Sequence, residues 1–175
     1  MNWIHQKHAR VLAIAPSTKG FGFAVLEGRA ILVDWGVKTI KRDKNRWTLE
    51  KVGKLIEQYQ PEVMVLQDFS MRHSRRSPRI RALGRQLVAR AASRKVAVAL
   101  FTRKQVRKVF FGGEQGTKDG IAEILAKQFP EELGSRLPPR RRPWMSEDYR
   151  MGIFDAVSLA LTFAYVKSIT PTRPD

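Results

Sequence analysis

Three short apolar stretches near the start of the chain predict three β-strands. They cover residues 10–15, 21–26 and 30–35, and short turns separate them. Connections of this length join antiparallel neighbours, so the pattern predicts a three-stranded meander. Two later apolar stretches, residues 62–68 and 96–101, predict two further strands. The first of these is dense in apolar residues, as expected of a central strand that is covered on both faces.

After the meander, and before and after each of the two later strands, the apolar spacing changes to that of helices. Leu49, Val52, Leu55 and Ile56 recur at helical spacing, and Pro61 ends this first predicted helix. The last helix is expected to begin at Ser146 as its N-cap. The predicted helices cover residues 47–59, 77–94, 103–110, 118–129 and 146–167.

The order of these elements predicts an α/β fold with a mixed five-stranded sheet. The three antiparallel meander strands are followed by two parallel strands, and helices cover both faces. This order matches the ribonuclease H-like fold. The length of 175 residues favours one domain, which we expect at residues 10–168, between an N-terminal arm (1–9) and a C-terminal tail (169–175).

The composition narrows the class of protein further. The chain has no cysteine, which excludes disulfides, cysteine metal sites and thiol nucleophiles. Its hydrophobic fraction of 43% is that of a globular domain. We find no secretory signal, and no continuous apolar run approaches the roughly 20 residues that span a bilayer. We therefore expect a cytoplasmic protein that does not contact a membrane.

A large excess of positive charge points to a polyanionic partner. The chain holds 33 Lys and Arg against 16 Asp and Glu, a net charge of +17. Residues 72–95 carry nine of the cations and no acid, and further clusters lie at residues 103–108 and 140–142. Nucleic acid is the commonest such partner, with salt-sensitive binding, although an unspecialised basic surface is the alternative. The expected contacts are Arg72, Arg75, Arg76, Arg79, Arg107, Lys108, Lys118, Arg140, Arg141 and Arg142. Trp144, beside the last cluster, is a candidate for base stacking.

Candidate chemistry lies at two strand ends and on the last helix. Ligands gather at the carboxyl ends of central strands in such sheets, here residues 14–17 and 66–69. Asp155 stands in an otherwise apolar helix, where an acid requires exposure, a cationic partner such as arginine, or a metal ion. Asp148 precedes it by seven residues, so on one helix the two would share a face about 10 Å apart.

Four segments, in this order, resemble motifs of the RuvC Holliday-junction resolvases of the ribonuclease H-like superfamily. Residues 12–25 and 65–71 are similar to the first-strand and fourth-strand motifs. Residues 106–119 resemble the basic DNA-contacting segment, and residues 155–160 resemble the C-terminal Asp-Ala-Leu-Ala-Ile-Ala run. The resemblance implies an endonuclease of DNA recombination and repair that cuts four-way junctions as a homodimer. It also implies four acids that hold two Mg²⁺ or Mn²⁺ ions.

Three of these four acid positions are not acidic in this sequence. Ala15 stands at the first-strand Asp position, Gln67 at the fourth-strand Glu position, and Gly152 at one of the two helix positions. Only Asp155 matches. We therefore expect Mg²⁺ or Mn²⁺ to bind weakly and cleavage to be slow or absent.

Three explanations of the missing acids remain open at this stage. Ala15 and Gln67 are engineered changes, or the protein has naturally lost catalysis, or the site is rebuilt from other acids. In the last case Asp68, Asp148 and Asp155 would bind the metal, with Glu147 beside them. Lys118 would approach a phosphate and stabilise charge that develops on it. The alternative functions are a non-catalytic DNA- or RNA-binding protein and an RNA-processing nuclease of the same superfamily.

Overall fold

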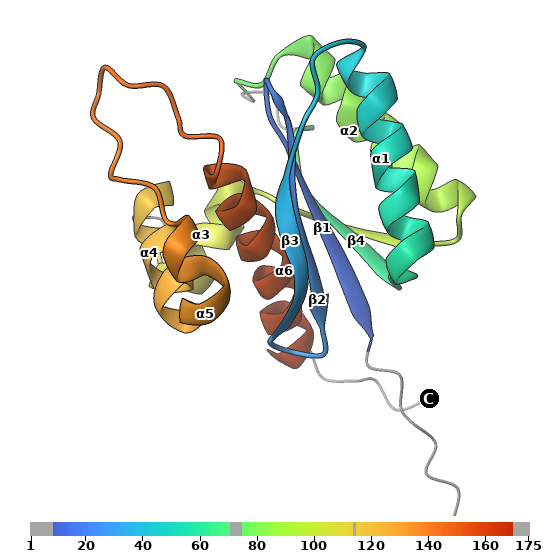
Figure 1. Cartoon of the computed structure of the whole chain (residues 1–175). Coiled ribbons are helices and arrows are strands. Elements are labelled where there is room, and N and C mark those ends of the chain that lie inside the picture. Colours follow the sequence, from blue (N-terminus) through green and yellow to red (C-terminus); the bar gives the residue numbers. More distant parts are fainter. Residues whose placement is uncertain (1–8, 71–74, 114, 170–175) are drawn as a thin grey trace, which may run out of the picture.

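A mixed five-stranded sheet forms the centre of the molecule (Figure 1). The computed structural model describes residues 9–70, 75–113 and 115–169. The strand order is β3-β2-β1-β4-β5, with β1, β2 and β3 antiparallel and β4 and β5 parallel to β1. The predicted mixed sheet is therefore confirmed. The strands are β1 (Arg10–Pro16), β2 (Gly20–Glu27), β3 (Ile31–Thr39), β4 (Val63–Gln67) and β5 (Ala97–Phe101).

The third strand is longer than its apolar stretch predicts. It continues to Thr39 because β2 offers partners along its whole length, and Gly20 pairs with Thr39 at the end. Gly20 has φ +152°, and a Cβ there would lie 1.9 Å from the carbonyl oxygen of Lys38. Only glycine fits this close approach of the two strands. The pairing, rather than side-chain hydrophobicity, therefore sets the end of β3.

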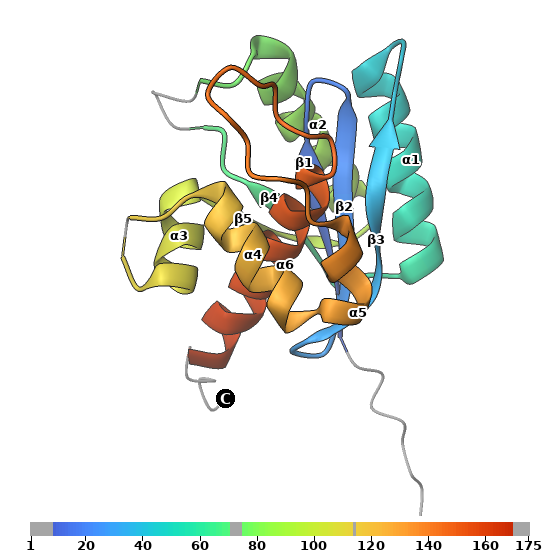
Figure 2. The ribbon, with the colours of Figure 1, turned by 60° about the vertical axis from the view of Figure 1, so that its left-hand side comes forward.

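Helices cover both faces of the sheet, as the sequence predicts (Figures 1 and 2). Helices α1 and α2 lie on one face, and α6, α3 and α4 lie on the other. The short helix α5 was not predicted; Pro130 opens it directly after α4. The helices are α1 (Lys44–Tyr59), α2 (Pro78–Ser93), α3 (Arg103–Phe111), α4 (Lys118–Gln128), α5 (Pro130–Leu133) and α6 (Met151–Ile169).

Strand alternation divides the core into two layers. In β1, Leu12 and Ile14 pack toward α1 and α2, whereas Ala13 and Ala15 pack toward α6. In β4, Leu66 faces α1 and α2, and Val65 faces α6. The alternation therefore places the side chain of Gln67, two residues after Val65, on the same face of the sheet as α6.

Helix α6 packs against the sheet on the α6 side. It contacts β1, β2, β3 and β4, and α3 and α4 pack against it. Among the described helices it is the one long and apolar enough to cross a membrane by length and composition alone. It includes Asp155 and Lys167, and side chains such as Ala156 and Ala160 are fully buried. This packing is that of the core helix of an α/β domain.

Candidate functional site: a cationic pocket

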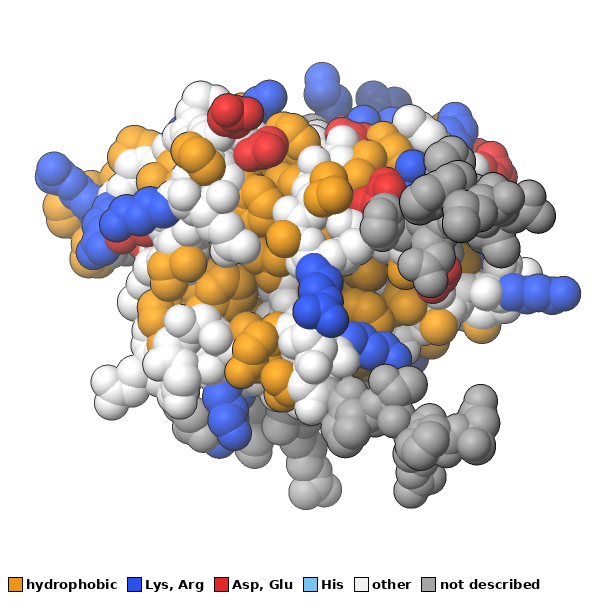
Figure 3. All heavy atoms as spheres, turned by 90° about the horizontal axis from the view of Figure 1, so that it is seen from below, with side chains coloured by type: hydrophobic (Ala, Val, Ile, Leu, Met, Phe, Trp, Pro, Cys, Tyr) orange, Lys and Arg blue, Asp and Glu red, His pale blue; other side chains and the backbone are white. Residues whose placement is uncertain are grey.

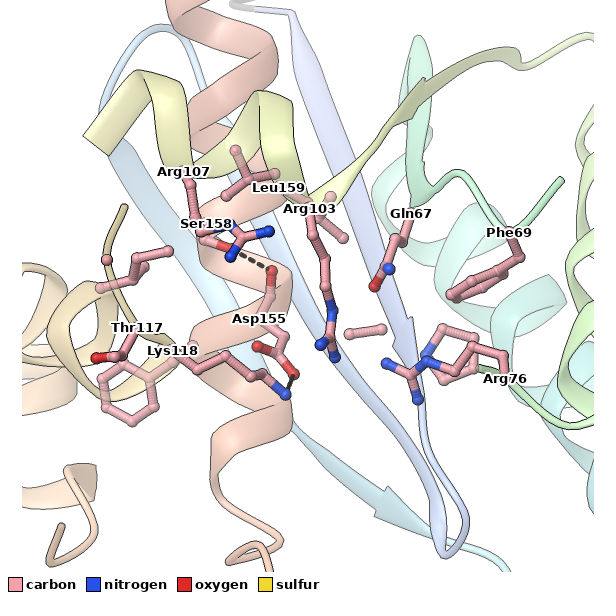
Figure 4. A pocket seen from close by; sticks show the side chains of 16 residues that line it. Gln67, Phe69, Arg76, Arg103, Arg107, Thr117, Lys118, Asp155, Ser158 and Leu159 are labelled. Carbon is pink, nitrogen blue, oxygen red and sulfur yellow. Dashed lines mark hydrogen bonds and ion pairs between the residues drawn. The ribbon is translucent and has the colours of Figure 1, made fainter. Parts of the chain in front are cut away.

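A pocket of about 220 Å³ opens where β1 and β4 end and where α3, α4 and α6 approach them (Figure 4). Ala15 is the last residue but one of β1, Gln67 ends β4, and Asp155 lies in the second turn of α6; all three line this pocket. The structure thus brings together the residues at the two strand ends and the acid in the apolar helix that the sequence singled out. Lys118, at the start of α4, lines it as well.

Asp155 has a cationic partner, which is a lysine. Its Oδ2 lies 2.9 Å from the Nζ of Lys118, and the same Nζ lies 2.5 Å from an oxygen of Glu147. The Asp155 side chain is 30% exposed. Desolvation raises the pKa of Asp155, and the attraction of Lys118 opposes that rise. Lys118 therefore serves as the counterion of Asp155 and bridges it to Glu147.

Three arginines add positive charge to the pocket. Figure 4 shows Arg76 and Arg103 extending toward its middle, while Arg107 lies near Ser158. Burial lowers the pKa of Arg76, and repulsion from Arg103 lowers it further, against the attraction of Asp155. Two guanidinium groups thus share a partly desolvated space.

Arg103 was not among the predicted nucleic-acid contacts, although a helix N-cap in the sequence indicates where it lies. Thr102 caps α3 in a capping box with Gln105, directly after β5 ends. Arg103 is therefore the first residue of α3, at the carboxyl end of the sheet. Arg107 follows one helical turn later on the same face. The side chains of Arg103 and Arg107 make no hydrogen bond to another described residue, and the Nε of Arg107 is buried without a partner.

The residues of the pocket do not fit a two-metal centre. Mg²⁺ requires carboxylates, yet four cationic side chains face the single carboxylate of Asp155, and that carboxylate is paired with Lys118. Among the described residues, no group of three or more Asp, Glu or His could hold a metal ion. Gly152 lies against β2: a Cβ on it would meet the backbone of Gly22 at 3.3 Å. The backbone of β2 thus leaves little room for a side chain at position 152.

Two acids proposed as metal ligands lie elsewhere. Asp68 continues the sheet without a bulge, since its backbone N–H donates to Phe101 at 2.8 Å. It therefore falls on the α2 side, lines a separate pocket there with Arg81 and Arg85, and accepts hydrogen bonds from Ser70. A site that combines Asp68 with Asp155 is not formed.

Asp148 is not part of the last helix, which begins at Met151 rather than Ser146. Its carboxylate accepts hydrogen bonds from the backbone N–H of Arg150 and from the Arg150 guanidinium at 2.8–3.0 Å. These bonds hold residues 148–150 in a turn, and they lower the pKa of Asp148. Asp148 lines a groove beside the pocket together with Glu147, Asp155 and Lys118. Asp148 is paired with Arg150 and precedes the helix. The prediction that Asp148 and Asp155 share one helix face is therefore wrong.

Of the other predicted nucleic-acid contacts, some are exposed, whereas Arg79 makes hydrogen bonds within the protein. Arg72 lies outside the described residues, and Arg75 and Lys108 are exposed. Arg79 donates to Asn45 and to the carbonyl oxygen of Ser17, which ties α2 to α1 and to the β1–β2 turn. Arg79 is therefore partly structural.

The loop between α5 and α6 presents the third arginine cluster. Arg140 donates two hydrogen bonds to Glu123 on α4, and Arg141 donates to the carbonyl oxygen of Met145. Arg142 lies 5.6 Å from the centre of the Trp144 ring, and Trp144 is 75% exposed. The loop is thus anchored while its cations and its tryptophan stay at the surface.

The opposite end of the sheet has a different character. Figure 3 views the molecule from that end and shows hydrophobic side chains over much of the face, with Lys and Arg scattered among the coloured residues. Ile31, which is 60% exposed, belongs to the β2–β3 end. The cationic pocket is therefore a feature of one end of the domain.

The sheet order, the helices on both faces and the pocket at the strand ends define a ribonuclease H-like fold of the RuvC resolvase type. Thermus thermophilus RuvC is similar over 91% of this chain and 96% of its own, with a TM-score of 0.66 and 18% identity. T. thermophilus RuvC in complex with a Holliday junction substrate gives a TM-score of 0.68 at 19% identity, over 91% of this chain and 95% of that one. The yeast mitochondrial Holliday junction resolvase Ydc2 gives 0.60 at 15% identity, over 92% and 80% of the two chains. No family model and no curated protein matches the sequence.

Proposed function

We propose that this chain binds branched DNA, and four-way junctions in particular, without cleaving it by two-metal hydrolysis. The observation that carries the proposal is the pocket itself. It lies where the resolvase fold gathers its acids, yet it holds three arginines and a lysine against one carboxylate. Its structural neighbours include a RuvC bound to a Holliday junction substrate.

The charge distribution supports nucleic acid as the partner. The pocket cations adjoin the strand ends, and the exposed arginines of the loop at residues 140–142 add further positive charge. Each cation that approaches a phosphate releases counterions, so affinity falls steeply with salt. Phosphate contacts of this kind read the shape of a branched molecule rather than its base sequence. A junction has two-fold symmetry, so we propose that the chain binds it as a homodimer.

The loss of catalysis is best explained as a natural feature of the chain. Engineered changes at positions 15 and 67 would leave the remainder of a metal site in place. Here Gly152 also lacks an acid and packs against Gly22, and Lys118 occupies the one remaining carboxylate. Without a bound metal, no group in the pocket lowers the pKa of an attacking water.

The test is a competition experiment by fluorescence anisotropy, in excess EDTA and in Mg²⁺ or Mn²⁺. The competitors are a four-way junction, a linear duplex of the same sequence and a structured RNA. We expect the junction to bind most tightly in both conditions and to remain intact when it is analysed on denaturing gels. Metal-dependent nicking of the junction would overturn the non-catalytic part of the proposal. Equal affinity for the duplex, or tighter binding of the RNA, would overturn the choice of partner.

A further inference from the structure

The pocket contains hydrogen-bond donors that lack acceptors. The Nε of Arg107 is buried with no partner. The side chain of Arg103 is exposed and makes no hydrogen bond to another described residue. A buried donor without an acceptor costs free energy in the folded protein. Both arginines line the same pocket, so one ligand with several acceptor oxygens can satisfy them together.

The cationic side chains of the pocket outnumber its one carboxylate, Asp155. The carboxylates of Asp155 and Glu147 are both within 2.9 Å of Lys118. Arg76 and Arg103 nevertheless repel each other: burial and Arg103 lower the pKa of Arg76, and the attraction of Asp155 and Glu147 opposes this. A bound anion would relieve this repulsion, whereas a bound cation would increase it.

The shape and the chemistry of the pocket select the kind of anion. A guanidinium presents parallel N–H donors that match the oxygens of a phosphoryl group. The volume of about 220 Å³ exceeds what one phosphate needs, since a water molecule occupies about 30 Å³ in the liquid. The remaining wall is apolar, formed by Phe69, Val106 and Phe154 among others. Such a wall suits the sugar and base attached to a phosphate better than it suits bulk water.

We infer that this pocket binds a phosphodiester directly through Arg103 and Arg107, with no bridging metal ion. Arg76 and Lys118 add long-range attraction. The inference rests on the proposed function for the source of the phosphodiester, which is the bound nucleic acid. It goes further in naming the two side chains that replace a metal centre as the ligands of the phosphate.

The test uses the full chain, labelled with ¹⁵N, and follows the arginine Nε–Hε signals by NMR in excess EDTA. The probes are thymidylyl-(3′→5′)-thymidine, which carries one phosphodiester, and inorganic phosphate. We expect saturable shifts of the Arg103 and Arg107 signals with the dinucleotide, at lower concentration than with phosphate. Arg103→Gln and Arg107→Gln should each weaken dinucleotide binding at least about tenfold. Arg136→Gln, which removes an exposed arginine that does not line the pocket, should leave it unchanged.

Several outcomes would overturn the inference. These are the absence of saturable shifts, tighter binding of inorganic phosphate than of the dinucleotide, or an equal loss of affinity in Arg136→Gln. Because Arg103 is exposed, its replacement keeps the test valid even where Arg107→Gln unfolds. A chain that prefers the junction over the duplex but does not bind the dinucleotide retains its proposed function and loses this inference. A chain that binds the dinucleotide but prefers duplex or RNA over the junction retains this inference and loses its proposed function.

Discussion

Restoring acids at positions 15 and 67 is not expected to restore a metal site. The variant Ala15→Asp/Gln67→Glu would supply two carboxylates beside Asp155 at the strand ends. Lys118 would still be in place, with its Nζ 2.9 Å from Oδ2 of Asp155 and 2.5 Å from Glu147. Any ion that binds Asp155 must therefore share the carboxylate with this ammonium group.

The size of the effect follows from that distance. Mg²⁺ lies about 2.1 Å from a ligand oxygen, so an ion on Oδ2 and the Nζ of Lys118 are at most about 5 Å apart. The repulsion between charges of +2 and +1 at about 5 Å is about 2 kcal/mol in water and about 7 kcal/mol at an effective dielectric constant of 20. Because the Asp155 side chain is 30% exposed, the lower value applies. Removal of Lys118 should then strengthen metal binding at least about tenfold.

Isothermal titration calorimetry with Mn²⁺ can measure this difference. Ala15→Asp/Gln67→Glu is compared with the same variant carrying Lys118→Gln, and a parallel variant carries Lys127→Gln at an exposed position near the end of the same helix. We expect tighter Mn²⁺ binding with Lys118→Gln only. If Ala15→Asp/Gln67→Glu alone binds Mn²⁺ as tightly as the Lys118→Gln variant, the cation does not block the site, and the argument against metal binding fails.

Three further predictions test other parts of the structure. Desolvation and a hydrogen bond to Asp34 raise the pKa of Tyr59 to about 12. The neutral phenol therefore adds stability below pH 10 that is lost as the pH rises toward 12, and Tyr59→Phe should remove the late step in an ultraviolet titration. Glutamine at residues 140–142 should weaken junction and duplex binding alike and reduce the salt slope by up to about three, measured by anisotropy across a KCl series. Gly22→Ala should cost about 3 kcal/mol or more in urea unfolding, because its Cβ would lie 2.0 Å from the carbonyl oxygen of Gly152; a loss below about 1 kcal/mol would refute this packing.

The strand pattern of the sequence contains enough information to place part of the site. Ile14 pairs with Leu66 in the parallel register of β1 and β4, so the next side chains on the α6 side, Ala15 and Gln67, fall near each other. Alternation also assigns Asp68 to the other face unless a bulge intervenes. The sequence alone does not decide whether there is a bulge. The backbone hydrogen bond from the N–H of Asp68 to the carbonyl oxygen of Phe101 excludes one.

The rest of the site depends on side-chain contacts that no local pattern encodes. The start of α6 was predicted five residues early because Ser146 resembles an N-cap, whereas the bonds between Asp148 and Arg150 hold a turn before the helix. The approach of Arg76 to Arg103 joins the segment between β4 and α2 to the start of α3. Such contacts arise only once the helices have packed on the sheet.

The exchange of acids for arginines changes which state of a phosphodiester the fold stabilises. A metal pair acts on the attacking water and on the leaving oxygen, so its interactions grow toward the transition state. Arginines that contact the phosphate oxygens stabilise the bound diester itself, and binding that is equal in the ground state and the transition state does not accelerate the reaction. The one carboxylate among the residues that line the pocket, Asp155, is paired with Lys118. Under the proposed function, the pocket therefore binds the phosphodiester through guanidinium groups and leaves it intact.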